Sequence, residues 1–246
     1  MKSILVIVAL VVIAVFAPAM VRAQTNSAPT TPAVNAADRE QATLEKHLKP
    51  VMAALNLNDA EKETKVREIL AAQFKALNAW HTQNDAQIKA LWNDFNAARS
   101  AQNVTNANVA LDKIGGVYAT FRPQHDKFIS DLLSDLSPAQ VESVKDSLTI
   151  NKVKVTYDVY LQIFPTLTDE QKAVVLKNLK DAREEAIDCE AMTEKSTFFK
   201  KYKIKIEDDY LTAQGYDPKQ ARKDFATKQK AEAAARKPAP PADDKK

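Results

Sequence analysis

The chain has 246 residues, of which 45% are hydrophobic and 27% are charged, so it is long and apolar enough to form one or two globular domains. Only 3 residues are glycine, and no GxGxxG or GxxxxGK motif occurs, which excludes Rossmann and P-loop nucleotide sites. The net charge of only +3 gives no electrostatic reason to expect nucleic acid or an anionic membrane as a partner.

The first 23 residues are typical of a secretory signal peptide. Lys2 supplies a positive charge, residues 4–16 form an uninterrupted apolar run, and Val21-Arg22-Ala23 resembles a cleavage site. We therefore expect cleavage before Gln24 and export to the periplasm or the exterior, although Ala17-Pro18-Ala19 would also permit an earlier cut. A retained signal anchor is the alternative, but a spanning helix needs about 20 apolar residues. Cleavage removes two cations and no acid, so the net charge falls from +3 to +1.

The mature chain is expected to be a single elongated all-α domain over residues 38–232. Residues 24–37 are rich in Ser, Thr, Asn, Ala and Pro and predict a flexible linker, and residues 233–246 predict a disordered tail. Four helix starts are marked by a capping residue followed three positions later by Glu or Gln. These pairs are Asn58 and Glu61, Ser137 and Gln140, Thr168 and Gln171, and Asp217 and Gln220.

The first half predicts a long antiparallel helix hairpin. An initial helix over residues 38–55 should be bent or broken at Pro50. A second helix from residue 59 past residue 95 and a third across residues 111–132 each carry apolar residues at helical spacing. The polar break at residues 103–108 joins them, so the two one-sided apolar stripes should face each other.

The second half predicts a shorter helical bundle. Residues 149–155 (TINKVKV) alternate between polar and apolar, which favours an extended segment. Gly215 is expected to end a helix in the left-handed conformation. The predicted helices are Ser137–Leu148, Thr156–Phe164, Thr168–Cys189, Thr193–Ala213 and Pro218–Arg236.

No motif in the sequence predicts catalysis, a metal site or a cofactor. His47, His81 and His125 lack the HxxxH and HExxH spacings of zinc sites, and no GxSxG elbow or Cys–His dyad is present. We expect His81 and His125 to approach each other across the hairpin as an interhelical contact rather than as metal ligands. Adjacent acids such as Glu184-Glu185 do not share a helix face and are expected to be solvated. Cys189, the lone cysteine, should be a small buried hydrophobe.

Tyrosine and charged residues are concentrated in the second half and form the candidate ligand site. A tyrosine ring covers the apolar face of a sugar, and fixed Arg or Asp groups bind vicinal hydroxyls. Pro165 forces a short turn, so the helices on either side should be neighbours. The alternative is that the same side chains form a polar network that ties helices together. The candidates are Tyr157, Tyr160, Arg183, Asp188, Lys201 and Tyr202.

Several segments resemble a secreted bacterial family of unknown function that carries a sugar-binding label and is similar in setting to polysaccharide-degradation systems. They include Val144-Lys145-Asp146, Pro165-x-Leu167-Thr168, Ala182-Arg183-Glu184, Phe199-x-Lys201-Tyr202-Lys203 and Gly215-Tyr216-Asp217. The resemblance covers roughly residues 42–226. It implies an exported, non-catalytic carbohydrate-binding protein and brings no catalytic residues with it. Cys189 and Ile204 depart from the family pattern, which counts against ligand contacts at those two positions.

A second resemblance implies a different function. Leu136-Ser137-Pro138-Ala139-Gln140 and Leu167-Thr168-Asp169-Glu170-Gln171 are similar to the LTxxQ signature of small helical periplasmic chaperones. Physically, each motif is a leucine followed by a helix cap whose Gln closes a capping box. The alternative function is therefore a periplasmic chaperone or envelope-stress protein, which would expose an apolar concave face on a dimer.

Overall fold

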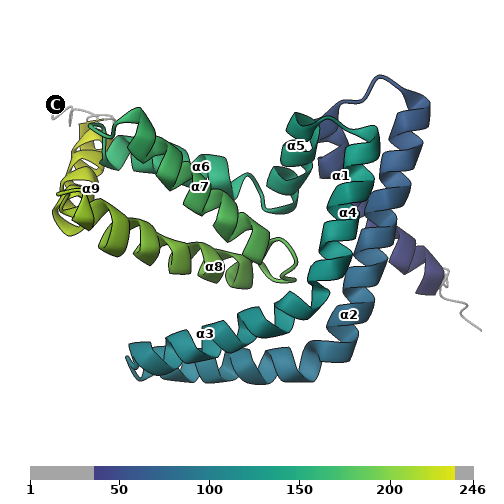
Figure 1. Cartoon of the computed structure of the whole chain (residues 1–246), viewed down its shortest axis with the longest axis horizontal. Coiled ribbons are helices and arrows are strands. Elements are labelled where there is room, and N and C mark those ends of the chain that lie inside the picture. Colours follow the sequence, from purple (N-terminus) through teal and green to yellow (C-terminus); the bar gives the residue numbers. More distant parts are fainter. Residues whose placement is uncertain (1–35, 236–246) are drawn as a thin grey trace, which may run out of the picture.

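The computed structural model describes residues 36–235, and every regular element in this range is helical, which confirms the all-α prediction (Figure 1). The predicted signal peptide lies outside the described residues, as do most of the predicted linker and tail. None of the described helices is long and apolar enough to cross a membrane. The elements are α1 (Ala36–Leu55), α2 (Ala60–Ser100), α3 (Val104–Tyr118), a 3₁₀ helix (Ala119–Phe121), α4 (Arg122–Asp135), α5 (Pro138–Leu148), α6 (Lys152–Ile163), α7 (Asp169–Ala186), α8 (Met192–Ile204), a π-helical segment (Lys205–Leu211) and α9 (Pro218–Ala235).

The long hairpin is present. The 41-residue α2 packs against α4 along its first half and against α3 along its second half, and Figure 1 shows that α2 bends between these two parts. Trp80 of α2 packs where α3 ends and α4 begins: its indole Nε1 donates to Thr120 Oγ1 at 3.1 Å, and its ring lies 5.2 Å from that of Tyr118. We call the second half of α2 together with α3 the arm.

Local capping chemistry sets many of the helix boundaries. The capping boxes at Ser137 and Thr168 both form, and Asp217 caps α9 through the backbone N–H of Gln220 at 2.9 Å. α2 is capped by Asp59 rather than by the predicted Asn58, since the Asp59 carboxylate accepts from Lys62 N at 3.0 Å. Gly215 has φ of 84°, as the predicted left-handed helix end requires.

Three expectations about the helices were wrong. The third helix, expected across residues 111–132, is divided, since α3 ends at Tyr118 and α4 begins at Arg122 with Pro123 in its first turn. α1 continues through Pro50 without a break, because residues on both sides of it, including Leu48 and Val51, are buried in one core. The extended segment expected at residues 149–155 does not occur, since α6 already begins at Lys152. Its alternating pattern covers a tight left-handed turn and the first helical turn, and a pattern this short cannot separate strand from helix.

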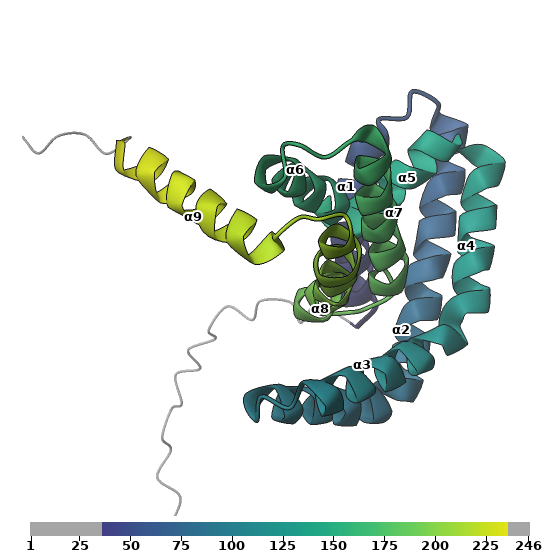
Figure 2. The ribbon, with the colours of Figure 1, turned by 60° about the vertical axis from the view of Figure 1, so that its left-hand side comes forward.

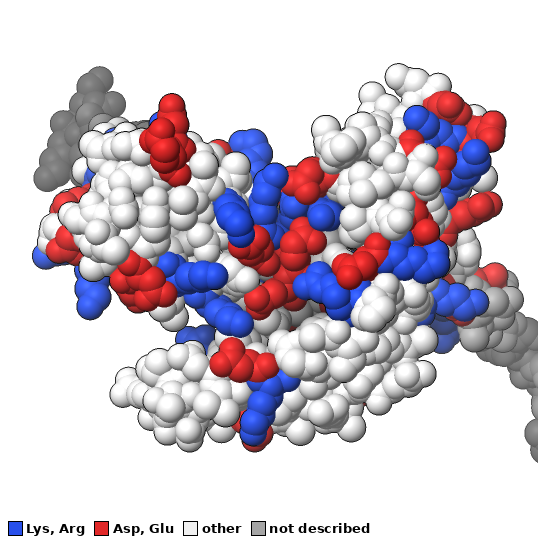
Figure 3. All heavy atoms as spheres, in the orientation of Figure 1, with Lys and Arg blue, Asp and Glu red and all other residues white. Residues whose placement is uncertain are grey.

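The buried apolar side chains form two separate cores. The proximal core lies among α1, the first half of α2, α4 and α5. The distal core joins the arm to α6, α7, α8 and the π-helical segment, and it includes Cys189, which is buried as predicted. Charged side chains of both signs gather between two largely uncharged lobes (Figure 3). α9 projects from the rest of the molecule (Figure 2).

Candidate functional site

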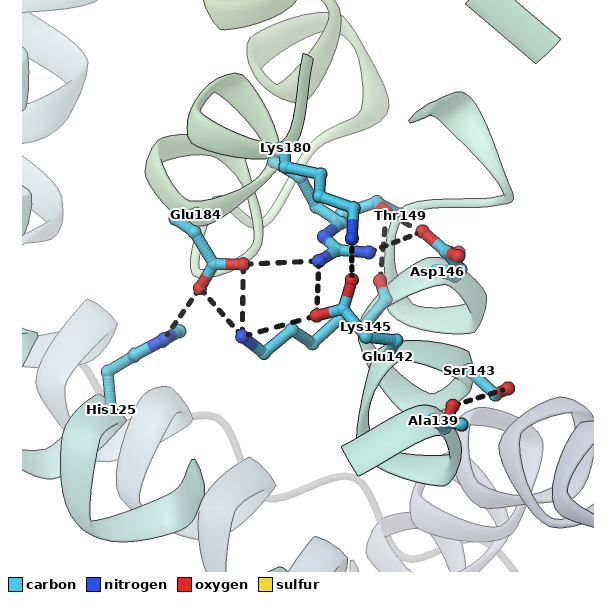
Figure 4. A network of polar contacts seen from close by, with 10 residues as sticks. His125, Ala139, Glu142, Ser143, Lys145, Asp146, Thr149, Lys180 and Glu184 are labelled. Atoms are coloured by element: carbon cyan, nitrogen blue, oxygen red, sulfur yellow. Dashed lines mark hydrogen bonds and ion pairs between the residues drawn. The ribbon is translucent and has the colours of Figure 1, made fainter. Parts of the chain in front are cut away.

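Arg183 binds three carboxylates of an ion network between α5 and α7, those of Glu142, Asp146 and Glu184, which Figure 4 labels. Its side chain is 1% exposed, and its terminal nitrogens bind Asp146 at 2.6 Å and Glu142 at 2.8 Å. Lys145 extends the network to Glu184 at 3.1 Å. Carboxylates of the protein occupy both terminal nitrogens, so Arg183 joins α7 to α5. This is the polar network that the sequence analysis gave as the alternative to a ligand site.

His125 and His81 come together through Asp188 rather than through each other. His125 is 2% exposed, with Nδ1 3.0 Å from Asp188 Oδ2 and Nε2 3.4 Å from Glu184 Oε2. His81 Nε2 lies 2.9 Å from the backbone oxygen of Asp188. The loop after α7 is therefore fixed to both helices of the hairpin.

Electrostatics in this cluster favour the charged forms. Burial alone would lower the pKa of His125, but its contacts with Asp188 and Glu184 outweigh burial and raise the pKa to about 9. Burial would likewise raise the pKa of Glu184, but His125 and Lys145 lower it to about 2. At neutral pH the cluster therefore holds an imidazolium between carboxylates.

The predicted residues on α8 share one partner. The Tyr202 hydroxyl donates to Glu185 Oε1 at 2.7 Å, and Lys201 Nζ lies 3.3 Å from Glu185 Oε2. Lys201 also reaches across to Asp112 on the arm at 3.6 Å. Glu184 and Glu185 were expected to be solvated but are partly buried. Glu184 contacts His125 and Lys145, whereas Glu185 contacts Tyr202 and Lys201.

The two predicted tyrosines of α6 lie elsewhere. α6 and α7 are neighbours, as the turn at Pro165 predicts. Tyr160, however, donates to Glu207 Oε1 of the π-helical segment at 2.7 Å, and Arg222 binds the same carboxylate. Tyr157 is half-buried at the edge of the distal core. The expectation that Tyr157 and Tyr160 face Arg183 and Asp188 is wrong. Tyr160 binds Glu207 instead, and Tyr157 packs against the distal core.

Two of the candidates, Asp188 and Lys201, line a cavity between the arm and the α7–α8 region, and we call it the polar cleft. It has a volume of about 280 Å³. Tyr118 and Phe198 lie in its walls as buried rings. Its charged lining residues are Asp112, Arg122, Glu184, Glu185, Asp188 and Lys201.

Two lining residues were not predicted. Arg122 is half-buried at the start of α4, and within residues 36–235 its side chain makes no hydrogen bond or ion pair. Gly115 lies inside α3, and a Cβ added there would meet no atom within 4 Å, so this glycine leaves the cleft open. The sequence could have indicated Gly115, because a glycine inside a helix destabilises it by about 1 kcal/mol relative to alanine and so points to a special role at that position. No motif marks Arg122.

Metal binding has no preformed site in the part of the chain described, where no three His, Cys, Asp or Glu side chains are arranged to hold an ion. The polar cleft can instead offer hydrogen-bond donors from Arg122 and Lys201 and acceptors from carboxylates. This combination suits a small polar ligand.

Comparison with known families identifies the family of this chain. A family described as protein of unknown function (DUF3826) matches residues 41–231, and its description names no ligand. None of the curated proteins compared with the chain matches it. Since the matched range covers most of the chain, this protein belongs to the DUF3826 family.

Proposed function

We propose that this protein is an exported, non-catalytic carbohydrate-binding protein and that the polar cleft is its site. The observation that carries the proposal is Arg122, a half-buried guanidinium at the cleft without a side-chain partner among the described residues. A guanidinium offers five donors in a planar fork and binds paired oxygens well. Adjacent hydroxyls of a sugar ring present such oxygens, and the carboxylates of Glu185 and Asp188 accept from other hydroxyls.

The dimensions of the cleft favour a small ligand. Its volume of about 280 Å³ is close to the lower end of ligand pockets, which start at about 300 Å³. One sugar ring, or the end of a short saccharide, is in keeping with this size. Phe198 is 0% and Tyr118 7% exposed, so recognition would rest on polar groups rather than on a ring stacked against the sugar.

The charge state of Glu184 suits a binding residue rather than a proton donor. A glycosidase needs a carboxylic acid that can deliver a proton near neutral pH. The pKa of Glu184 is held at about 2, because His125 and Lys145 outweigh burial, so this group stays ionised. A fixed carboxylate of this kind serves as a hydrogen-bond acceptor.

Two adjacent glycines offer a matched steric test. Gly115→Leu would fill the cleft, whereas Gly116→Leu would place the same side chain on the exposed surface of α3. Both changes raise helix propensity, so both variants should fold. We would screen residues 24–246 on a glycan array and titrate the best saccharide by calorimetry. Loss of binding in Gly115→Leu but not in Gly116→Leu supports the proposal. A blank array, or normal binding by Gly115→Leu, contradicts it.

A chaperone function is the second candidate, and one observation favours it. Val104 is 67% and Ile204 50% exposed, so apolar surface is available to a client. The two LTxxQ-like motifs act as helix caps at Ser137 and Thr168 and give no separate support. A chaperone should suppress aggregation of an unfolded client at a near-stoichiometric ratio. That activity without glycan binding would favour this candidate.

A further inference from the structure

A second cavity lies between the end of the arm and the elements α8, the π-helical segment and α9, and we call it the basic groove. It has a volume of about 500 Å³, larger than the polar cleft. Six Lys or Arg side chains line it, against two acidic ones, Glu207 and Asp208. Figure 3 shows basic side chains along the seam between the arm and α8. The groove therefore has an excess of positive charge in a nearly neutral protein.

Only part of this charge is neutralised inside the protein. Glu207 is 5% exposed, and Arg222 and Tyr160 bind its carboxylate. Arg99, Lys200 and Lys219, in contrast, have no acidic partner among the described residues. The Arg99 guanidinium lies 5.8 Å above the ring of Phe95. Three cations from three helices thus face one cavity without counter-ions from residues 36–235.

The same groove exposes apolar side chains. Val104 and Ile204, among the most exposed large hydrophobic residues described, both line it. Phe95 and Pro218 lie behind them as buried wall residues. An exposed apolar surface next to unpaired cations is complementary to a molecule that combines an apolar body with a negative group.

We propose that the basic groove binds an anionic amphiphile, that is, an acyl chain with a carboxylate, phosphate or sulfate head. The apolar chain would cover Val104 and Ile204, and the head would be neutralised by Lys200, Lys219 or Arg99. An acidic polysaccharide would meet the charges equally well, but it would place hydroxyl groups against Val104 and Ile204. The exposed apolar side chains therefore favour the amphiphile. The groove shares Lys201 with the polar cleft, but Val104, Ile204, Arg99, Lys200 and Lys219 line the groove alone, so the proposal does not depend on carbohydrate binding.

The probe is laurate, used below its critical micelle concentration and followed by calorimetry. Butyrate supplies the charge without the chain, and 1-dodecanol supplies the chain without the charge. Two variants remove one contribution each: Val104→Ser with Ile204→Ser removes the apolar contact, and Lys219→Glu reverses one charge. The matched controls are Val155→Ser on α6, which is 59% exposed, and Lys230→Glu, which is exposed on α9, and neither residue lines the groove.

Laurate should bind more tightly than butyrate and 1-dodecanol. Each groove variant should weaken laurate binding by about tenfold or more, which corresponds to about 1.4 kcal/mol, and the two controls should leave it unchanged. Gly115→Leu should also leave it unchanged, so that this result is independent of the polar cleft. Absence of laurate binding, or equal affinity in the groove variants and controls, overturns the proposal. If the protein binds polygalacturonate but not laurate, and the groove variants weaken that binding, the groove binds acidic saccharides and the amphiphile proposal is overturned. Flotation with phosphatidylglycerol vesicles, without binding of monomeric laurate, would indicate an anionic bilayer surface as the partner and contradict binding of a single amphiphile in the groove.

Discussion

Replacing Arg183 tests whether the network between α5 and α7 is structural. Arg183→Ala removes ion pairs of 2.6 Å to Asp146 and 2.8 Å to Glu142. Removing one partner of a buried ion pair costs about 3–5 kcal/mol. Here the carboxylates that remain are 36% (Glu142) and 29% (Asp146) exposed, and Lys180 still binds Glu142 at 2.8 Å. Water and Lys180 therefore offset part of the loss, and we expect a destabilisation of about 2–4 kcal/mol.

In a domain of this size, 1 kcal/mol shifts the melting temperature by about 2–4 °C. Arg183→Ala should thus lower the melting temperature by about 4–16 °C in a calorimetric scan. The control is Lys177→Ala on the same helix, whose ion pair with Asp181 is exposed and should contribute little. Folded Arg183→Ala should still bind the saccharide. A variant that keeps its stability but loses binding would refute the structural role and return Arg183 to the site.

Three further predictions concern stability and accessibility. The pKa of His125 is raised to about 9, so its contribution to the free energy of unfolding should be complete below about pH 6.5 and lost as the pH rises through 9. Urea unfolding from pH 6 to 10 should show this loss. His125→Gln should remove this pH dependence of the free energy of unfolding. Gly116→Ala should stabilise α3 by about 0.5–1 kcal/mol, measured by urea unfolding, since a Cβ there meets no atom within 4 Å. Cys189 is 2% exposed and burial raises its pKa, so a maleimide should label it only after unfolding; rapid labelling of the native protein would contradict its placement in the core.

The helical elements were largely predictable because their signals are local. The boxes at Ser137 and Thr168 and the left-handed Gly215 each depend on a few neighbouring residues, and all three form. The error at residues 149–155 has the opposite cause. An alternation of seven residues fits a strand. Residues from Lys152 onward are helical instead, because a helix buries Val153 and Tyr160 together in the distal core.

The candidate site was predicted only in part, because its contacts are between residues far apart in the sequence. The sequence selects Arg183 as a candidate, but its partners Asp146 and Glu142 lie 37 and 41 positions away. Tyr160 finds Glu207 across 47 positions. Periodicity shows which side of a helix is buried, but it does not show which helix covers that side.

Arg122 provides the most direct test of the polar cleft as the ligand site. Since its side chain has no partner within the described range, Arg122→Met should leave the melting temperature unchanged. The decisive measurement is a calorimetric titration of this variant with the saccharide chosen on the array, beside Lys127→Met on the same helix, whose exposed side chain pairs with Asp131. The account predicts that Arg122→Met weakens binding by about tenfold or more, while Lys127→Met binds normally. Equal affinity in the wild type and Arg122→Met would contradict it.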